Sequence, residues 1–312
     1  MSQKIATRDA YGEILVELGK KNPRIVALDA DLSKSTKTAN FKKAFPQRFF
    51  NMGVAEADMM GTAAGLAAAG LIPFASTFAV FATGRVYDQL RNSIAYPNLN
   101  VKIVATHAGI TVGEDGGSHQ SIEDIAIMRV MPNMTVIVPA DGPETKKAVE
   151  AAVEMDGPVY IRLGRSGVPV IFSEEEPFTP GRGKILREGS DISIIAVGIM
   201  VSKALEAAQT LSQKGIEARV INMSSIKPLD QDMIVQAARE TGGIVTAEEH
   251  SIIGGLGGAV SEVTAERYPV PVKRVGVQDT FGESGSPELL LEKYGLTPEN
   301  IVKAVEEILQ KR

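Results

Sequence analysis

Two of the three histidines of this 312-residue chain lie in one glycine-rich segment. The segment runs from His107 to Gln120 and reads HAGITVGEDGGSHQ, so two imidazoles and two carboxylates share it with four glycines. Such groups exchange protons and hydrogen bonds near neutral pH, while the glycines let the backbone approach a ligand closely. The segment follows a predicted strand at 101–106, and open α/β sheets bind ligands at the carboxyl ends of strands. A ligand site is predicted here, with a solvated surface loop as the alternative.

A second candidate is the segment NMGVAE at residues 51–56, which ends in Glu56. Glu56 begins an Ala-rich predicted helix, where a carboxylate also stabilises the positive helix end without any catalytic role. The helix lacks a polar face and is therefore expected to be buried on all sides. Gly61 and Gly65 would let another element approach it closely, which suits a position between subunits.

Further candidates lie near the ends of predicted elements. Phe78 and Phe81 follow a predicted strand, and core packing is the ordinary use of such a pair. Arg8, Ser35 and Arg165 also lie near element ends, where solvated surface residues are the alternative. The run GGLGG at 254–258 lacks the third spaced glycine of a dinucleotide-binding loop.

Strand-like and helix-like patterns alternate along the first half of the chain. Such alternation predicts a mainly parallel sheet with helices on both faces. Strands are expected at 24–30, 71–75, 101–106, 135–139 and 159–163, and helices at 10–18, 57–69, 86–95 and 143–155.

An acidic and then Pro/Gly-containing stretch at 173–187 interrupts this alternation and predicts a linker. Beyond it the alternation resumes, with strands expected at 192–197, 218–222, 244–247 and 272–276 and helices at 201–214, 231–241, 259–266 and 299–309. The sequence therefore predicts two doubly wound α/β domains, at 1–172 and 188–312.

Composition excludes several classes of protein. The formal net charge of −5 leaves no excess of basic residues for a nucleic acid, and the chain contains no cysteine for disulfides or zinc–thiolate sites. The N-terminus has no apolar signal core, so a cytoplasmic location is expected. Residues 59–84 carry no charge, but their Ala, Gly, Pro and Thr content favours a buried helix and strand over a membrane span.

Taken together, these segments resemble the C-terminal half of a transketolase, with its pyrimidine-binding and third domains as a separate subunit. The resemblance covers nearly the whole chain. It rests on IATR at 5–8, DADL at 29–32, GVAE at 53–56, Thr77-Phe78, GEDGGSHQ at 113–120 and FGESG at 281–285.

The resemblance implies roles for ten residues. Glu56 would hydrogen-bond N1′ of the aminopyrimidine of thiamine diphosphate, with Asp31 nearby and Phe78 and Phe81 as the aromatic wall. Substrate-binding residues would be His107, His119 and Asp115 on the sugar and Arg8, Ser35, His107 and Arg165 on its terminal phosphate. His107 and His119 are catalytic candidates together with Glu56, and no metal ligand is expected on this chain.

Two departures from the family pattern affect what this chain can do. Gly84 stands where a third aromatic residue is usual, and Tyr87 is a candidate replacement. The Gly-Asp-Gly motif with a downstream Asn, which holds magnesium and the diphosphate in thiamine enzymes, is missing. The resemblance therefore implies a partner N-terminal-type subunit that binds Mg²⁺, in an assembly with two copies of each chain.

The expected activity is transfer of a two-carbon ketol unit between sugar phosphates, as in pentose phosphate and carbohydrate metabolism. Other thiamine enzymes remain alternatives, namely a deoxyxylulose phosphate synthase-like protein or the beta subunit of a 2-oxo acid dehydrogenase. A non-catalytic regulatory subunit with the same fold is the alternative from a different class.

Overall fold

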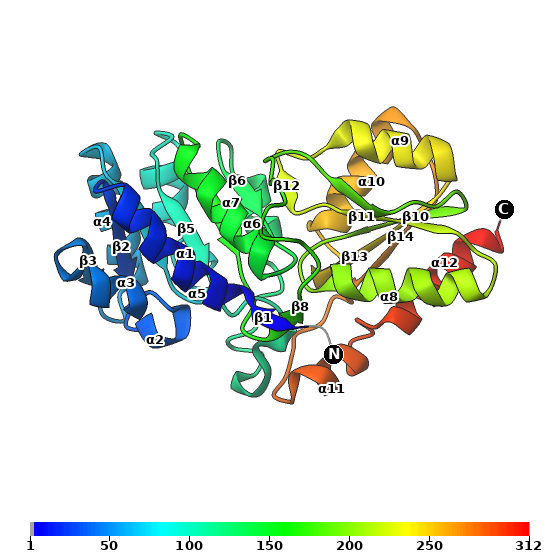
Figure 1. The fold of residues 1–312 in the computed structure, drawn as a ribbon, viewed down its shortest axis with the longest axis horizontal. Helices are drawn as coiled ribbons and strands as arrows, with labels where there is room; N and C mark the ends of the chain where they lie inside the picture. The colour runs from blue at the N-terminus through cyan, green and yellow to red at the C-terminus, as the bar shows by residue number, and fades with distance from the viewer. Residues whose placement is uncertain (1–2, 312) are drawn as a thin grey trace.

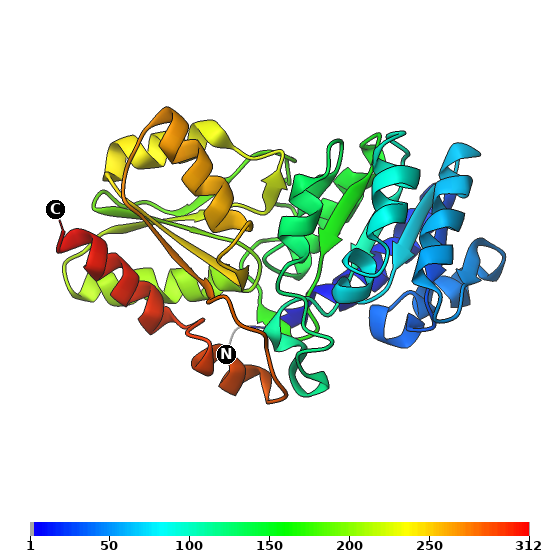
Figure 2. The same ribbon diagram turned by 180° about the vertical axis from the view of Figure 1, so that it is seen from behind.

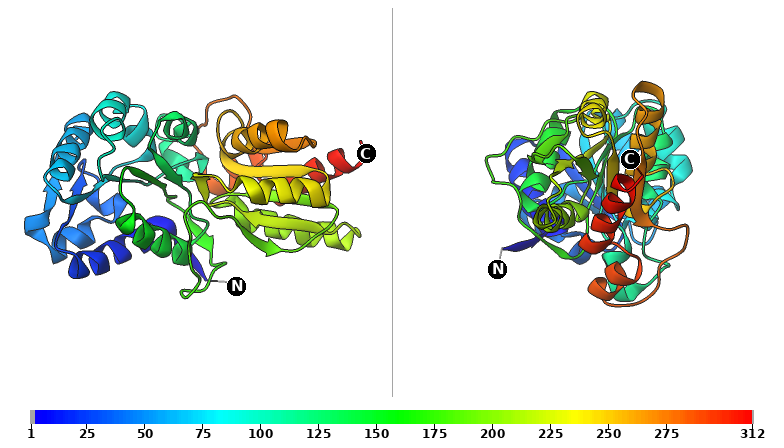
Figure 3. Two further views of the ribbon diagram at one scale, coloured as in Figure 1. Left: turned by 90° about the horizontal axis from the view of Figure 1, so that it is seen from above. Right: turned by 90° about the vertical axis from the view of Figure 1, so that its right-hand side faces the viewer.

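The computed structural model describes residues 3–311, which form two α/β lobes side by side along the longest axis (Figures 1 and 3). The first lobe contains a seven-stranded sheet and the second a five-stranded sheet. The expectation of two doubly wound α/β units with mainly parallel sheets is confirmed. The ends of the two predicted domains at residues 1, 2 and 312 lie outside the described residues.

The first sheet is parallel except at one edge. Its strands lie in the order β12 (Ser225–Lys227), β6 (Thr135–Ile137), β7 (Val159–Arg162), β5 (Lys102–Ala105), β4 (Ile72–Ser76), β2 (Ile25–Asp29) and β3 (Phe49–Asn51). Only β12 runs antiparallel, against β6. Because β12 comes from the second half of the sequence, the two halves of the chain are joined at this edge.

Helices cover both faces of the first sheet because its strands alternate their side chains between two cores. Ile25 and Ala27 face α1 (Thr7–Lys21) and α7 (Gly142–Glu154). Val26 and Leu28 instead pack with the helices of the other face, which are α4 (Glu56–Ala68), the π-helix η2 (Gln89–Ala95) and α6 (Asp124–Val130). Apolar residues on both faces of a strand are typical of a parallel sheet.

Short elements complete this lobe. They are the helices α2 (Ser33–Thr36), α3 (Ala39–Ala44), η1 (Pro46–Arg48), α5 (Ala79–Thr83) and η3 (Ile110–Asp115), and the paired strands β1 (Lys4–Ala6) and β8 (Gly167–Pro169).

The second sheet has the order β14 (Val272–Val277), β13 (Ile244–Ser251), β10 (Ile192–Ala196), β11 (Ala218–Asn222) and β9 (Lys184–Arg187). Only β9 is antiparallel to its neighbour. Figures 1 and 2 show α8 (Met200–Gln213) and α12 (Pro298–Leu309) on one face, with α9 (Gln231–Thr241) and α10 (Leu256–Arg267) on the other. A further helix, α11 (Pro287–Lys293), lies beside the first lobe.

Within the single chain, the helix expected at 57–69 is buried on one side only. Met59 and Met60 of α4 are fully buried, but Gly61, Gly65 and Ala68 are exposed. A Cβ atom added to Gly61 or Gly65 would meet nothing within 4 Å. The helix therefore presents a face of small residues that no other part of the described chain covers.

The helices between residues 3 and 311 are all too short or too polar to cross a membrane. In the same range no three His, Asp or Glu side chains are grouped so that they could hold a metal ion.

Candidate active site

The candidate residues converge because they follow four neighbouring strands. Asp31, Phe78, His107 and Arg165 come after β2, β4, β5 and β7, which are adjacent and parallel. The carboxyl ends of parallel strands meet at one edge of the sheet, as expected for a ligand site of an open α/β fold.

The Phe78 and His107 loops are also hydrogen-bonded to each other. The Ala79 amide donates to the Thr106 carbonyl over 2.8 Å, and the Thr106 amide donates to the Thr77 carbonyl over 3.1 Å. These bonds form a parallel bridge between Phe78 and Thr106, just beyond the ends of β4 and β5. They bring the rings of Phe78 and His107 into a stack with centroids 3.8 Å apart.

Both other aromatic candidates join this stack. The rings of Phe78 and Phe81 are nearly parallel, with centroids 6.1 Å apart. His119 meets both phenylalanines edge-on, at 6.4 Å from Phe78 and 5.4 Å from Phe81. The two histidines and two phenylalanines predicted from the sequence therefore form one continuous cluster.

Arg8 links the N-terminus of α1 to this cluster. Its guanidinium donates to the Ser35 carbonyl over 3.1 Å and lies 3.2 Å from Nε2 of His107. Ser35 contributes its backbone rather than its hydroxyl to this contact. Since a guanidinium only donates, Nε2 of His107 must accept, and the ring proton then lies on Nδ1, where it faces Thr106 Oγ1 at 2.8 Å.

His107 is held neutral. Its burial, reinforced by the positive charges of Arg8 and Arg165, lowers its pKa to about 3. The imidazole therefore offers a neutral hydrogen-bonding edge over the whole physiological pH range. Burial also lowers the pKa of Arg8, although the guanidinium remains charged.

Arg165 bridges the cluster and the glycine-rich segment. Its guanidinium donates to the Val112 carbonyl over 2.6 Å and lies 3.5 Å from carboxylate oxygens of both Glu114 and Asp115. Arg165 also contributes to the positive field at Arg8 and His107. Arg165 therefore links the residues predicted to bind the sugar with those predicted to bind its terminal phosphate.

Glu56 is buried at the first turn of α4 and paired with an arginine that the sequence analysis did not single out. Its Oε1 accepts from Nη1 of Arg85 over 2.7 Å, and the Arg85 guanidinium lies 4.1 Å from the centroid of the Phe81 ring. Arg85 directly follows Gly84, where the third aromatic residue is missing. A planar, N–H-bearing cation is therefore stacked on Phe81 and bonded to Glu56.

Asp31 lies beside the turn that leads to Glu56. Asn51 accepts from the Asp31 amide and donates to the Asp31 carboxylate, both over 3.0 Å. Asp29, which is fully buried, organises the same loop by accepting from the Leu32 amide and from two threonine hydroxyls. Burial raises the pKa of Asp29, whereas these hydrogen bonds lower it.

Sequence reasoning missed several residues that complete the site, namely Asp29, Arg85, Thr106 and Glu249. Asp29 and Thr106 carried local signals, because Asp29 begins the DADL motif and Thr106 directly precedes His107 at a predicted strand end. Arg85 and Glu249 depend on contacts with residues far away in the sequence.

The residues fit the pyrimidine end of a thiamine cofactor. An aminopyrimidine is a planar heteroaromatic ring with N–H donors, and Arg85 shows that Glu56 and Phe81 accommodate a planar donor between them. A buried carboxylate suits a protonated ring nitrogen, and the ring of Phe81 suits a stacked heterocycle.

Two family models account for nearly the whole chain. The transketolase pyrimidine binding domain matches residues 3–170, and the transketolase C-terminal domain matches residues 181–301. The chain belongs to the transketolase family.

Relatives of similar length specify the type of chain. A putative transketolase C-terminal section of Methanocaldococcus jannaschii is 53% identical over 97% of this chain and 96% of that protein. A 6-deoxy-6-sulfo-D-fructose transketolase subunit of a Clostridium species is 48% identical over 98% and 95%. A solved split gene transketolase, described as an inactive beta4 tetramer, is 61% identical, covers 99% of both chains and has a TM-score of 0.91. This protein is accordingly a C-terminal subunit of a split transketolase.

Proposed function

We propose that this subunit, together with an N-terminal-type partner, transfers a two-carbon ketol unit from a ketose phosphate to an aldose phosphate. The observation that carries the proposal is the unbroken cluster from Glu56 through Phe81, His119, Phe78 and His107 to Arg8. It combines a carboxylate, an aromatic wall, two imidazoles and a cation in one site.

Glu56, Phe78 and Phe81 hold the pyrimidine end of thiamine diphosphate in this proposal, with Asp31 next to the same turn. The cofactor supplies a thiazolium carbon that acts as the nucleophile toward the ketose carbonyl. Glu56 would place a buried carboxylate at the pyrimidine end of the cofactor, where it would stabilise positive charge on a ring nitrogen.

The histidines and Asp115 act on the sugar. His119 packs edge-on against both phenylalanines and is therefore assigned to the carbonyl and hydroxyls nearest the cofactor. Asp115 accepts from a sugar hydroxyl. His107, neutral and stacked on Phe78, offers its ring nitrogens as hydrogen-bonding groups rather than as a charge.

Arg8 and Arg165 bind the terminal phosphate, with Ser35 and His107 beside them. The Arg8 guanidinium lies 3.2 Å from His107, and the positive charges of Arg8 and Arg165 both lower the pKa of His107, which supports one shared anion site. Forked N–H donors match the geometry of phosphate oxygens.

A terminal sulfonate is a second candidate for the anionic end of the substrate. The relative from Clostridium is named for a sulfosugar, and sulfonate presents the same tetrahedral oxygens with less negative charge. The cationic cluster is compatible with both anions. We propose phosphate as the primary substrate group, with sulfonate as the alternative.

The partner subunit supplies what this chain lacks in sequence. The Gly-Asp-Gly motif and its downstream Asn are absent, so Mg²⁺ and the diphosphate are assigned to an N-terminal-type chain, in an assembly of two copies of each subunit in the cytoplasm. The inactivity of the related beta4 tetramer supports the requirement for a second type of chain.

Calorimetry tests this division of labour. The isolated chain is titrated with thiamine diphosphate in the presence and absence of Mg²⁺, and the titration is repeated after the partner subunit is added. We expect negligible binding by the chain alone and magnesium-dependent binding by the mixture. Tight, magnesium-dependent binding by the isolated chain would refute the proposal.

A further inference from the structure

A segment of the second lobe lies against the loop that carries Asp115 and His119. The chain leaves β14, passes through residues 280–286 and enters α11 directly beside η3. Figures 1 and 2 show α11 next to this loop at the lower edge of the molecule. The contact joins residues that are about 170 positions apart in the sequence.

Hydrogen bonds join the two segments. The Ser284 hydroxyl donates to the Glu114 carbonyl over 2.9 Å. From the loop side, Nε2 of Gln120 donates to the Glu283 carbonyl over 2.9 Å and also reaches the carbonyls of Ile110 and Gly113. Gln120 is buried and adjacent to His119, so its amide connects both ends of the loop to the second lobe.

The glycines of the loop permit this close approach. A Cβ on Gly117 would lie 2.6 Å from the carbonyl oxygen of Gly282, and one on Gly116 would lie 2.6 Å from Ser284 Oγ. A Cβ on Gly282 would in turn overlap the side-chain oxygen of Gln120. Side chains at these positions would push the two segments apart.

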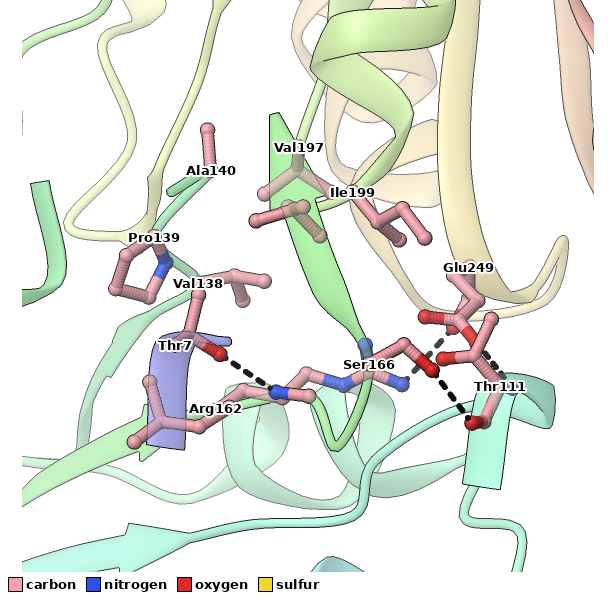
Figure 4. Close-up of a pocket in the computed structure, with 14 residues that line it drawn as sticks. Thr7, Thr111, Val138, Pro139, Ala140, Arg162, Ser166, Val197, Ile199 and Glu249 are labelled. Carbon is pink, nitrogen blue, oxygen red and sulfur yellow. Dashed lines mark hydrogen bonds between the residues drawn. The ribbon is translucent and has the colours of Figure 1, made fainter. Parts of the chain in front are cut away.

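A second attachment holds the start of the loop. Glu249 of β13 is buried and accepts from the Thr111 amide over 2.7 Å, as Figure 4 shows. Gly109, two residues earlier, has a φ of +80°, and a Cβ there would collide with the Glu249 carboxylate. Both ends of the sugar-binding loop are therefore attached to the second lobe.

We propose that the C-terminal domain positions the sugar-binding loop, with Glu249, Gly282, Ser284 and Gln120 as positioning residues for His119 and Asp115. The inference rests on the proposed function and assigns the second lobe a role in substrate specificity. The His119 side chain has only the neighbouring Ser118 as a hydrogen-bond partner within the described residues, so its place on the phenylalanines depends on the loop. Small displacements of a positioning group can lower catalysis by about 100-fold.

The test uses Gly282→Ala, Ser284→Ala and the matched control Ser286→Ala in the reconstituted complex. Ser286 lies in the same segment but makes no capping hydrogen bond through its side chain. We expect Gly282→Ala to lower kcat/KM for the donor ketose phosphate by about 10- to 100-fold. Ser284→Ala should lower it about 3- to 10-fold, while Ser286→Ala stays within twofold of the wild type.

Thiamine diphosphate affinity separates positioning from general damage. Because the positioning residues contact the sugar-binding loop and not Glu56, cofactor affinity should stay within twofold in all three variants. An equal loss of cofactor affinity and donor kcat/KM, or an unchanged donor kcat/KM in Gly282→Ala, would overturn the inference.

Glu249 offers a conservative rescue. Glu249→Gln keeps an oxygen that can accept from the Thr111 amide, whereas Glu249→Ala removes it. We expect donor kcat/KM to be at least 10-fold higher for Glu249→Gln than for Glu249→Ala, at similar cofactor affinity. Equal values for the two variants would count against the proposed attachment.

Hydrogen exchange on the isolated chain tests the positioning without any enzymatic activity. The amides of Gly116, His119 and Gln120 are bonded within the loop and should exchange faster in Gly282→Ala than in the wild type. Unchanged exchange would overturn the positioning role. If exchange is faster in Gly282→Ala but the reconstituted wild-type complex shows no ketol transfer, the positioning role is supported and the proposed function is refuted.

Discussion

Each charged side chain of the candidate site already has a partner within this chain. Glu56 is paired with Arg85, Arg8 with the edge of His107, and Arg165 with the carbonyl of Val112. These contacts keep the charges in place before a ligand arrives, but a ligand must displace those that occupy its position. Each of these charged residues therefore contributes to ligand affinity in two ways: by its contact with the ligand and by the contact that it must first give up.

Arg85→Ala should tighten binding of thiamine diphosphate to the reconstituted complex. The guanidinium stacks on Phe81 and bonds to Glu56, which is the place proposed for the aminopyrimidine. Because the Arg85 side chain is 47% exposed, its pairing stabilises by less than about 1 kcal/mol, so the gain should be at most about 5-fold.

Calorimetry measures this affinity, with Arg24→Ala as a control for loss of an exposed arginine at the other end of β2. Weaker binding in Arg85→Ala alone would mean that Arg85 forms part of the pocket wall and replaces the missing third aromatic residue.

Arg8→Ala and Arg165→Ala should each impair phosphorylated substrates selectively. A lost charge-assisted hydrogen bond costs about 1.5 to 3 kcal/mol, or about 10- to 150-fold in kcat/KM. An unphosphorylated sugar should lose little in the same variants, whereas His119→Ala should impair both substrates. Steady-state kinetics with a sugar phosphate, its 6-sulfonate analogue and the free sugar tests this, and equal losses on all three would disprove the anion assignment.

Among the secondary-structure elements, α4 has one face that no other part of the described chain covers. Its Ala-rich sequence led to the expectation of complete burial, yet one face is open and lined by Gly61, Gly65 and Ala68. Glu56 begins the same helix, so a subunit that packs on this face also approaches the proposed cofactor site. We assign the face to contact with a second subunit.

Gly65→Arg should prevent subunit assembly without unfolding the chain. There is open space around the position in the single chain, so the side chain is tolerated there, but it would clash with anything packed on α4. Gly65→Ala is the control and should assemble normally, since alanine favours helix by about 1 kcal/mol over glycine. Light scattering gives the mass, and normal assembly of Gly65→Arg would exclude this face as an interface.

The long elements were predictable from sequence because their patterns are local. The five central parallel strands of the first sheet and helices such as α7 and α12 follow apolar runs and periodicity. The short strands β9 and β12 and the helix α11 were not predicted, because three to seven residues carry too little pattern and their formation depends on distant partners.

The candidate site was likewise predictable where the signal is local, and not where it depends on distant contacts. Conspicuous residue types indicated His107, His119 and Glu56 as candidates, and the structure brings them into one cluster. The contacts of Arg85 with Glu56 and of Glu249 with Thr111 span 29 and 138 positions of sequence, which no local pattern reveals.

At the scale of the whole molecule, Glu144 joins the two lobes. This buried carboxylate of α7 accepts from Asn222 and Ser224 of the second half and from the Ala140 amide. Burial is the largest influence on Glu144 and raises its pKa to about 7, although these hydrogen bonds oppose the shift. We therefore expect the contact between the lobes to depend on pH.

Stability of the isolated chain should decrease as pH rises from about 4.5 to 7. In this window folded Glu144 holds a proton that the unfolded chain has released, so the free energy of unfolding falls, by on the order of 3 kcal/mol in total, and the fall from this group ends above pH 7. Denaturant unfolding of Glu144→Gln should show a flatter pH dependence than the wild type. An identical slope for both proteins would rule out Glu144 as the source.

The central claim is that the two kinds of subunit together transfer a ketol unit through a site built around Glu56. The most direct measurement is formation of the two-carbon-extended sugar phosphate by the reconstituted complex with thiamine diphosphate and Mg²⁺. We predict transfer only when both subunits are present, and a turnover at least about 100-fold lower with Glu56→Gln. Transfer by this chain alone, or an unchanged turnover in the assembled Glu56→Gln complex, would contradict the account.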